Sequence, residues 1–118
     1  MGEMNGSTVN IAIPAQLEKW VVAYKNVNRD EYDFYLKDFS LSRIRIKASK
    51  VKRERKYFAV SNYKLKYHST DNRFTVPYAL SDDAITAVFS CLESMINKGK
   101  IFSFEANSAY PGTPIVKR

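Results

Sequence analysis

The chain has 118 residues, of which 45% are hydrophobic and 14% aromatic, and it carries a formal net charge of +7. A chain of this length usually forms a single domain, and its apolar content argues against intrinsic disorder. It contains no apolar run of the roughly 20 residues that a membrane-spanning helix needs and no signal-peptide pattern, so we expect a cytoplasmic protein without a membrane partner. The single cysteine, Cys91, excludes an internal disulfide and fits a reducing compartment.

The part of the chain before the basic segment is predicted to form a strand, a helix and a second strand. Residues 1–7 are small and polar, and we expect a flexible leader there. Residues 8–13 alternate apolar and polar side chains, which predicts a strand. Pro14 suits the first position of a helix and apolar residues then recur at helical spacing, so we predict a helix over 14–25. Residues 31–41 are rich in aromatic side chains, which favours a strand, although their spacing also fits a helix.

The most distinctive stretch of the sequence is the basic segment 43–68. It carries ten lysines and arginines against one acid, Glu54, so its net charge of +9 leaves −2 for the other 92 residues. Apolar and basic side chains alternate along it, which predicts strands over 42–52 and 57–68. These two strands are expected to pair as a long antiparallel hairpin with a strongly basic face. The phase of the alternation changes after Ser49, which indicates a β-bulge or a break in the strand.

The second half of the chain contains the clearest helix signal. Residues 74–78 alternate and predict a strand. A broad apolar stripe then predicts a helix over 82–98, with Ser81 as the N-cap and two aspartates in the first turn, where the helix dipole favours acids. Residues 101–104 are expected to form one more short strand, and 107–118, which contain two prolines and a glycine, are expected to form a tail.

Together these elements predict one α+β domain over residues 8–106, with the tail 107–118 outside it. We expect an antiparallel sheet of four to five strands, because several segments with apolar and polar alternation precede the last helix. The C-terminal helix 82–98 and the N-terminal helix 14–25 are expected to pack on the apolar face of this sheet.

The clustered positive charge favours a non-enzymatic nucleic-acid-binding protein whose basic hairpin engages the phosphate backbone. Lysine and arginine contact phosphates and release counterions, and tyrosine can stack on the bases of single strands. The expected ligand is therefore single-stranded nucleic acid or RNA. The sequence does not distinguish DNA from RNA. The predicted binding residues are Arg43, Arg45, Lys47, Lys50, Lys52, Arg53, Arg55, Lys56, Tyr57, Lys64 and Lys66.

The same segment also permits interpretations without nucleic acid. It fits a solvated charged face backed by aromatic core residues, since lysine-rich strands protect exposed sheet edges from aggregation. It also fits a small protein-binding or inhibitor module, whose basic face docks on an acidic or nucleic-acid-binding surface of another protein. A homodimer is a further open alternative.

The sequence favours a protein that is not an enzyme. It contains no nucleotide-binding, metalloprotease or nucleophile-elbow motif, and we expect no cofactor. The only histidine, His68, has no cysteine or acid at ligand spacing, so we expect no metal site. His68 near Asp71 leaves a small hydrolase as a third and weaker alternative. Cys91 is expected to be a packing residue of the predicted helix 82–98.

Overall fold

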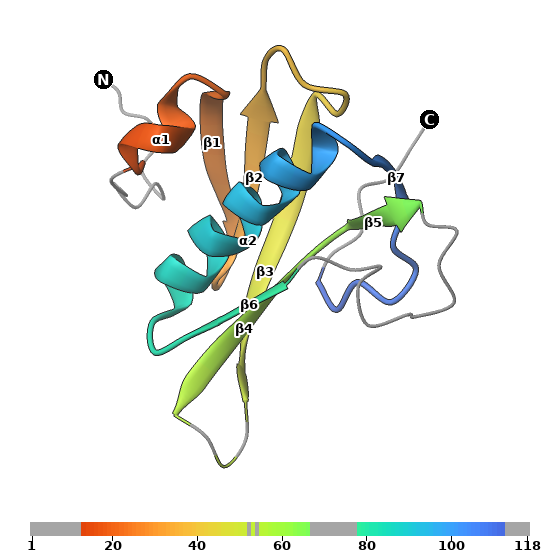
Figure 1. Ribbon diagram of the computed structural model, residues 1–118. Coiled ribbons are helices and arrows are strands. Elements are labelled where there is room, and N and C mark those ends of the chain that lie inside the picture. Colours follow the sequence, from red (N-terminus) through yellow and green to blue (C-terminus); the bar gives the residue numbers. More distant parts are fainter. Residues whose placement is uncertain (1–12, 52, 54, 67–77, 113–118) are drawn as a thin grey trace.

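The computed structural model describes residues 13–51, 53, 55–66 and 78–112. It combines a five-stranded antiparallel sheet, a two-stranded sheet, one long helix and one short helix, as shown in Figure 1. The predicted α+β class with an antiparallel sheet is confirmed. Almost all of the strand predicted over 8–13 lies outside the described residues, as do most of the strand predicted over 74–78, Asp71 and His68.

Two sheets and one long helix build the domain. In chain order, the elements are α1 (Ala15–Glu18), β1 (Val21–Asn28), β2 (Glu31–Leu36), β3 (Arg43–Val51), β4 (Lys56–Ser61), β5 (Tyr63–Lys66), β6 (Tyr78–Ser81), α2 (Ala84–Gly99) and β7 (Ser103–Ala106). The main sheet has the strand order β1-β2-β3-β4-β6, and β5 pairs with β7 in the small sheet. Helix α2 lies across one face of the main sheet, over β3, β4 and β6 (Figure 1).

Helix α2 forms because a capping residue favours its start and its apolar stripe packs into the core. The carboxylate of Asp83 caps the helix by accepting a hydrogen bond of 3.0 Å from the backbone N–H of Thr86. The predicted helix 82–98 is confirmed, although Ser81, the expected N-cap, is instead the last residue of β6. The buried face of α2 consists of Ala87, Val88, Phe89, Cys91, Leu92, Met95 and Ile96. Each large side chain among them stabilises the fold by about 1.5–3 kcal/mol through burial.

The helix predicted over 14–25 is wrong beyond its first turn. Helix α1 ends at Glu18, and the chain continues as β1, which pairs with β2 from Val21 opposite Leu36 to Asn28 opposite Glu31. The apolar residues that fit a helical period still pack against the core, but only Leu17 does so from a helix, while Trp20 lies in a turn and Val21 and Tyr24 lie in β1. Pairing with β2 satisfies the backbone hydrogen bonds of this segment, and such long-range contacts override a weak local preference.

The predicted basic hairpin is confirmed for β3 and β4. Their register runs without irregularity from Ile46 opposite Ser61 to Val51 opposite Lys56. The bulge or break that the sequence indicated after Ser49 is therefore absent from β3. The phase changes because Lys50, which lies on the α2 side of β3, is exposed, so this position does not require an apolar side chain.

The strand predicted over 57–68 divides at Asn62. The side-chain oxygen of Asn62 accepts a hydrogen bond of 2.9 Å from the backbone N–H of Arg45, and its own backbone N–H donates to the carbonyl of Arg45 at 2.9 Å. Asn62 thus closes the pairing with β3, and the chain turns away from the main sheet into β5. The expected strand over 101–104 exists as β7, shifted by two residues, and pairs with β5.

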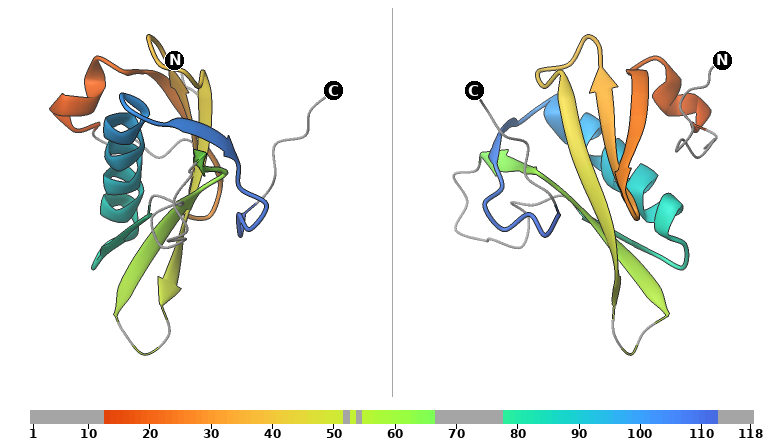
Figure 2. Two further views of the ribbon diagram at one scale, coloured as in Figure 1. Left: turned by 45° about the vertical axis from the view of Figure 1, so that its right-hand side comes forward. Right: turned by 180° about the vertical axis from the view of Figure 1, so that it is seen from behind.

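Side-chain alternation divides the main sheet into two faces. The face under α2 carries the core residues Phe34, Ile44, Ile46, Ala48 and Ala59, all fully or almost fully buried. The opposite face, here called the outer face, is partly covered by residues 107–112, as the left view of Figure 2 shows. There, the side-chain amide of Asn107 donates a hydrogen bond of 2.9 Å to the carbonyl of Ser61. The first half of the predicted tail is therefore packed on the domain.

Candidate nucleic-acid interface

The basic hairpin projects beyond the rest of the domain. Strand β2 pairs with β3 only as far as Lys47, which lies opposite Glu31. Further along, β3 pairs with β4 alone, while β6 joins β4 no further than Tyr57. Residues 49–57, here called the hairpin arm, therefore extend past β2, and the tip of the arm also extends past β6 (Figure 1). The connection at the tip of the arm passes through Arg53, whose φ of 74° is in the left-handed region that non-glycine residues rarely adopt.

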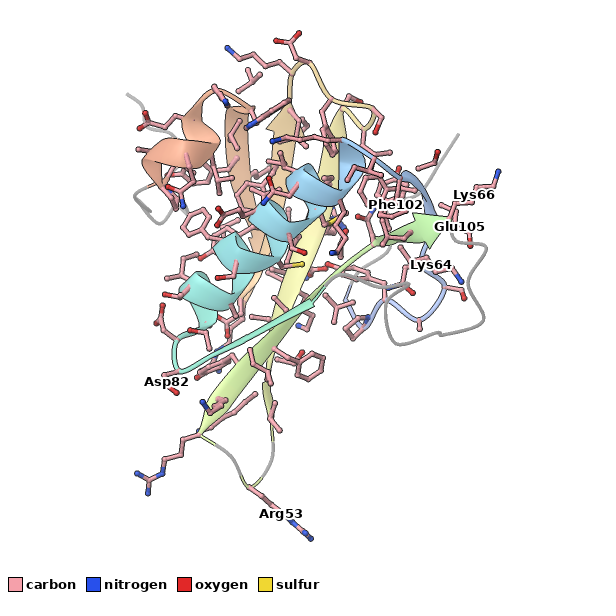
Figure 3. All side chains as sticks on the ribbon, viewed as in Figure 1. Arg53, Lys64, Lys66, Asp82, Phe102 and Glu105 are labelled. Carbon is pink, nitrogen blue, oxygen red and sulfur yellow. The ribbon has the colours of Figure 1, made fainter. Side chains whose placement is uncertain are left out.

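The described cations of the arm are exposed, and most have no acidic partner. Lys50, Arg53 and Arg55 are solvent-exposed, and within the described part of the chain none of them has a carboxylate within 4.0 Å. Figure 3 shows the side chain of Arg53 directed away from the body of the protein. Lys56 lies 3.6 Å from Asp82, but both side chains are exposed, so this pair contributes little and is screened by salt. Lys52 lies outside the described residues.

Arg43 and Arg45, both predicted to bind phosphate, are instead held by one buried acid. Asp33 is 0% exposed, and its carboxylate accepts hydrogen bonds from Arg45 Nε at 2.5 Å and from Arg43 Nη2 at 2.5 Å. Burial alone would raise the pKa of Asp33, but the hydrogen bonds from Arg45 and Arg43 outweigh it and lower that pKa. Asp33 is therefore ionised and neutralises the two guanidinium groups in part.

Arg45 is consequently placed where a phosphate cannot reach it. It is only 8% exposed, and a buried arginine with its charge satisfied by a carboxylate is a structural group. Arg43 differs, because its side chain remains 37% exposed and its guanidinium lies 5.3 Å from the centre of the Tyr35 ring. Arg45, predicted to bind phosphate, is thus buried in an ion pair away from the arm, and Arg43 lies only at the margin of the arm.

The other predicted residues separate into different places. Tyr57 is partly exposed and packs against the core on the α2 side of the sheet. Lys64 and Lys66 belong to β5, and Lys64 lies 3.6 Å from Glu105 of β7. Figure 3 shows Lys64, Lys66 and Glu105 together on the small sheet, well away from Arg53. The structure thus gathers Lys50, Arg53, Arg55 and Lys56 on one arm, with Lys47 at its base, and excludes the β5 lysines from it.

The outer face next to the arm carries an aromatic residue that the sequence-based prediction missed. Because Ala59 is fully buried under α2, the neighbouring Phe58 lies on the outer face, where it pairs with Ser49 on one side and Leu80 on the other. Phe58 is partly exposed, and Leu80 is 52% exposed. The sequence feature that could have indicated the position of Phe58 is the small residue Ala59. A small side chain fits the side of β4 that packs against α2, so its neighbour Phe58 lies on the other side.

A second cluster of charged residues lies under the C-terminal segment. The hydroxyl of Tyr110 donates a hydrogen bond of 2.6 Å to Glu31, which is almost completely buried beside Asp33 on the outer face. Burial, together with this hydrogen bond, raises the pKa of Tyr110. The carboxylate of Asp33 accepts a hydrogen bond from Arg45, and the carboxylate of Glu31 accepts hydrogen bonds from Tyr110 and Asn28. Both buried acids therefore have partners, and the hydrogen bond from Tyr110 holds residues 107–112 on the sheet. Among the described residues, no three histidine, cysteine or acidic side chains group in a way that could hold a metal ion.

The chain matches no protein-family model, no curated protein sequence and no solved structure. In the described ranges, no helix is long and apolar enough to cross a membrane. Inference about function therefore rests on the arm and on the outer face beside it.

Proposed function

We propose that the protein is a non-enzymatic nucleic-acid-binding protein and that the hairpin arm contacts the phosphate backbone of its ligand. The observation that carries this proposal is the set of exposed cations Lys50, Arg53 and Arg55, which have no carboxylate partner among the described residues and lie on an arm that projects from the domain. Each lysine or arginine that neutralises a phosphate releases bound counterions, which favours binding at low salt.

The charge distribution supports binding better than it supports solubility alone. Solubility requires only a modest net charge with both signs interspersed over the surface. Here the nine residues of the arm carry five lysines and arginines against one acid, Glu54, so their net charge of +4 is more than half of the +7 of the whole chain. Concentrating like charges on a two-stranded arm costs stability through repulsion, and an anionic ligand would relieve that repulsion.

The arm also has a suitable shape. A two-stranded β-ribbon is narrow enough to enter the major groove of duplex DNA, and an exposed strand pair can equally follow a single-stranded backbone. Backbone contacts of this kind carry no base sequence, so we expect weak sequence preference.

The test is fluorescence anisotropy with a labelled single strand of about 20 nucleotides and a matching duplex, titrated at low and moderate salt. At least one probe should bind, and binding should weaken steeply with salt, by a log–log slope of about 0.7–0.9 per phosphate contact. The double variant Arg53→Ala/Arg55→Ala should bind at least about tenfold more weakly and with a shallower slope.

The matched control is Lys37→Ala/Lys98→Ala, which removes the same charge from exposed positions at the other end of the domain. It should bind nearly as the wild type does. If neither probe binds at low salt, or if both double variants weaken binding equally, the proposed interface is refuted. An acidic protein surface is then the partner to test, with the same variants in a pull-down.

A further inference from the structure

The outer face beside the arm has a composition of its own. Register and alternation place side chains from three strands on it: Lys47, Ser49 and Val51 from β3, Lys56, Phe58 and Val60 from β4, and Leu80 from β6. Phe58 occupies the middle row, opposite Ser49 and Leu80, while Lys56 and Val60 lie two residues away along the same strand. Directly opposite side chains lie about 5 Å apart and diagonal ones about 7–8 Å apart, so both lysines are near the ring.

Side chains on this part of the outer face are left exposed, whereas residues 107–112 cover the part next to it. Over Glu31 and Ser61, residues 107–112 cover the sheet and are held by hydrogen bonds from Tyr110 and Asn107. Next to Phe58, by contrast, Leu80 remains 52% exposed. A large apolar side chain left half in water on a sheet face, beside a partly exposed phenyl ring, is a surface that gains free energy when a flat apolar group covers it.

We infer that this patch, made by Phe58 and Leu80 between Lys47 and Lys56, stacks an unpaired base, so that the ligand of the arm is single-stranded nucleic acid. The inference rests on the proposed function and adds to it the strandedness of the ligand. The charge of the patch decides between occupants, because its two lysines and the arm cations beside it suit an apolar ring that is attached to a phosphate. A neutral apolar partner would leave these cations without compensation.

The preference for single strands follows from access. In a duplex the faces of the bases are covered by their neighbours in the stack, so Phe58 could meet a base only after it had been unstacked. In a single strand the base faces are accessible, and stacking on an aromatic side chain is worth enough to lower the affinity by about fivefold to 150-fold when the ring is removed.

The test is the variant Phe58→Leu, which keeps an apolar side chain and removes the ring. Its affinity for the single strand should fall at least about fivefold, with little change in its affinity for the duplex. The matched control is Phe102→Leu, because Phe102 is also an exposed aromatic residue but lies near the C-terminal end of α2, far from Arg53 (Figure 3). This control should bind both probes as the wild type does.

A second variant, Phe58→Trp, keeps the test decisive even if Phe58→Leu is unstable. It should retain single-strand affinity, and its added tryptophan fluorescence should be quenched by the single strand and much less by the duplex. Absence of this quenching refutes the stacking inference, as does equal loss of single-strand and duplex binding in a folded Phe58→Leu variant.

The outcomes also separate this inference from the proposed function. If Phe58→Leu binds the single strand like the wild type while Arg53→Ala/Arg55→Ala does not, stacking is refuted and backbone binding stands. If no probe binds at all, both fail. If Phe58→Leu instead dissociates an oligomer, as seen by light scattering, the patch is an interface between copies of the chain and the stacking inference is refuted.

Discussion

The hydroxyl of Tyr110 donates a hydrogen bond of 2.6 Å to Oε2 of Glu31, although 79 positions of the sequence separate the two residues. Glu31 begins β2, and Tyr110 lies beyond the last strand of the domain. The hydrogen bond therefore fastens the C-terminal segment across the outer face of the sheet, next to the ion pair of Asp33 with Arg45. Because the acceptor is a buried carboxylate, the bond is charge-assisted and its loss should be costly.

The variant Tyr110→Phe tests this contact. It leaves the Glu31 carboxylate buried with one hydrogen bond fewer, and we expect the free energy of unfolding to fall by roughly 1–3 kcal/mol. Urea denaturation followed by circular dichroism measures the change. Tyr63→Phe is the control, because Tyr63 also packs against the core and its hydroxyl has no hydrogen-bond partner in the described ranges. An equal effect of both variants would contradict a specific role of Tyr110.

The pairing of Asp33 with two arginines predicts how stability depends on pH. Since the pKa of Asp33 is lower in the folded than in the unfolded protein, the ionised carboxylate stabilises the fold above its unfolded pKa of about 4. This contribution is lost as the pH falls through the folded pKa. The wild type should therefore lose stability on acidification below about pH 4, and thermal unfolding at a series of pH values measures the loss.

The variant Asp33→Asn assigns this loss to one group. It leaves Arg45 buried without its counter-charge, so we expect a destabilisation of roughly 3–5 kcal/mol at pH 7 and a weaker dependence of stability on acid. Asp38→Asn is the matched control. Asp38 is exposed with a φ of 56°, a conformation that asparagine also tolerates, so its stability should stay near that of the wild type. An acid dependence that survives in Asp33→Asn would assign the effect to other carboxylates.

Substitution of Arg53 can separate the effect of the arm's charge on binding from an effect on the stability of the fold. Its left-handed φ of 74° costs a non-glycine residue roughly 1–2 kcal/mol, and glycine avoids this cost while losing more chain entropy. Arg53→Gly should therefore be as stable as the wild type or more stable by about 1 kcal/mol, yet bind the single strand more weakly. Arg55 has no positive φ, so Arg55→Gly should weaken binding similarly but reduce stability. Weaker binding in Arg55→Gly alone would contradict a role of Arg53.

Cys91 reports on the packing between α2 and the sheet. It is fully buried in α2, and burial raises the pKa of its thiol to about 12, so little thiolate exists at neutral pH. The native protein should react with a thiol reagent at pH 8 far more slowly than the urea-unfolded protein, which should take up one equivalent. Fast modification without loss of structure would show that α2 does not cover this position. Because the chain has a single cysteine, the readout belongs to Cys91 alone.

Several elements could be predicted because their signals are local. The helix Ala84–Gly99 has a capping aspartate, an apolar stripe of helical period and a glycine at its end, all within one stretch of chain. The pairing of β3 with β4 follows from alternation in two neighbouring segments. The concentration of positive charge between residues 43 and 68 is a property of the sequence itself, and so is the presence of a single cysteine. Short-range geometry and composition suffice for all of these.

The tertiary structure alone decided which residues are available to a ligand. Val21–Asn28 became a strand because β2 offered it backbone partners, and Arg45 was withdrawn from solvent by Asp33, 12 positions away in the sequence. Phe58 reached the outer face because α2 covers the other side of β4. In each case the exposure of a side chain depends on which strand lies beside it and which face is covered. Both are settled by long-range pairing and packing, whose free energies exceed the local preferences that a sequence pattern expresses.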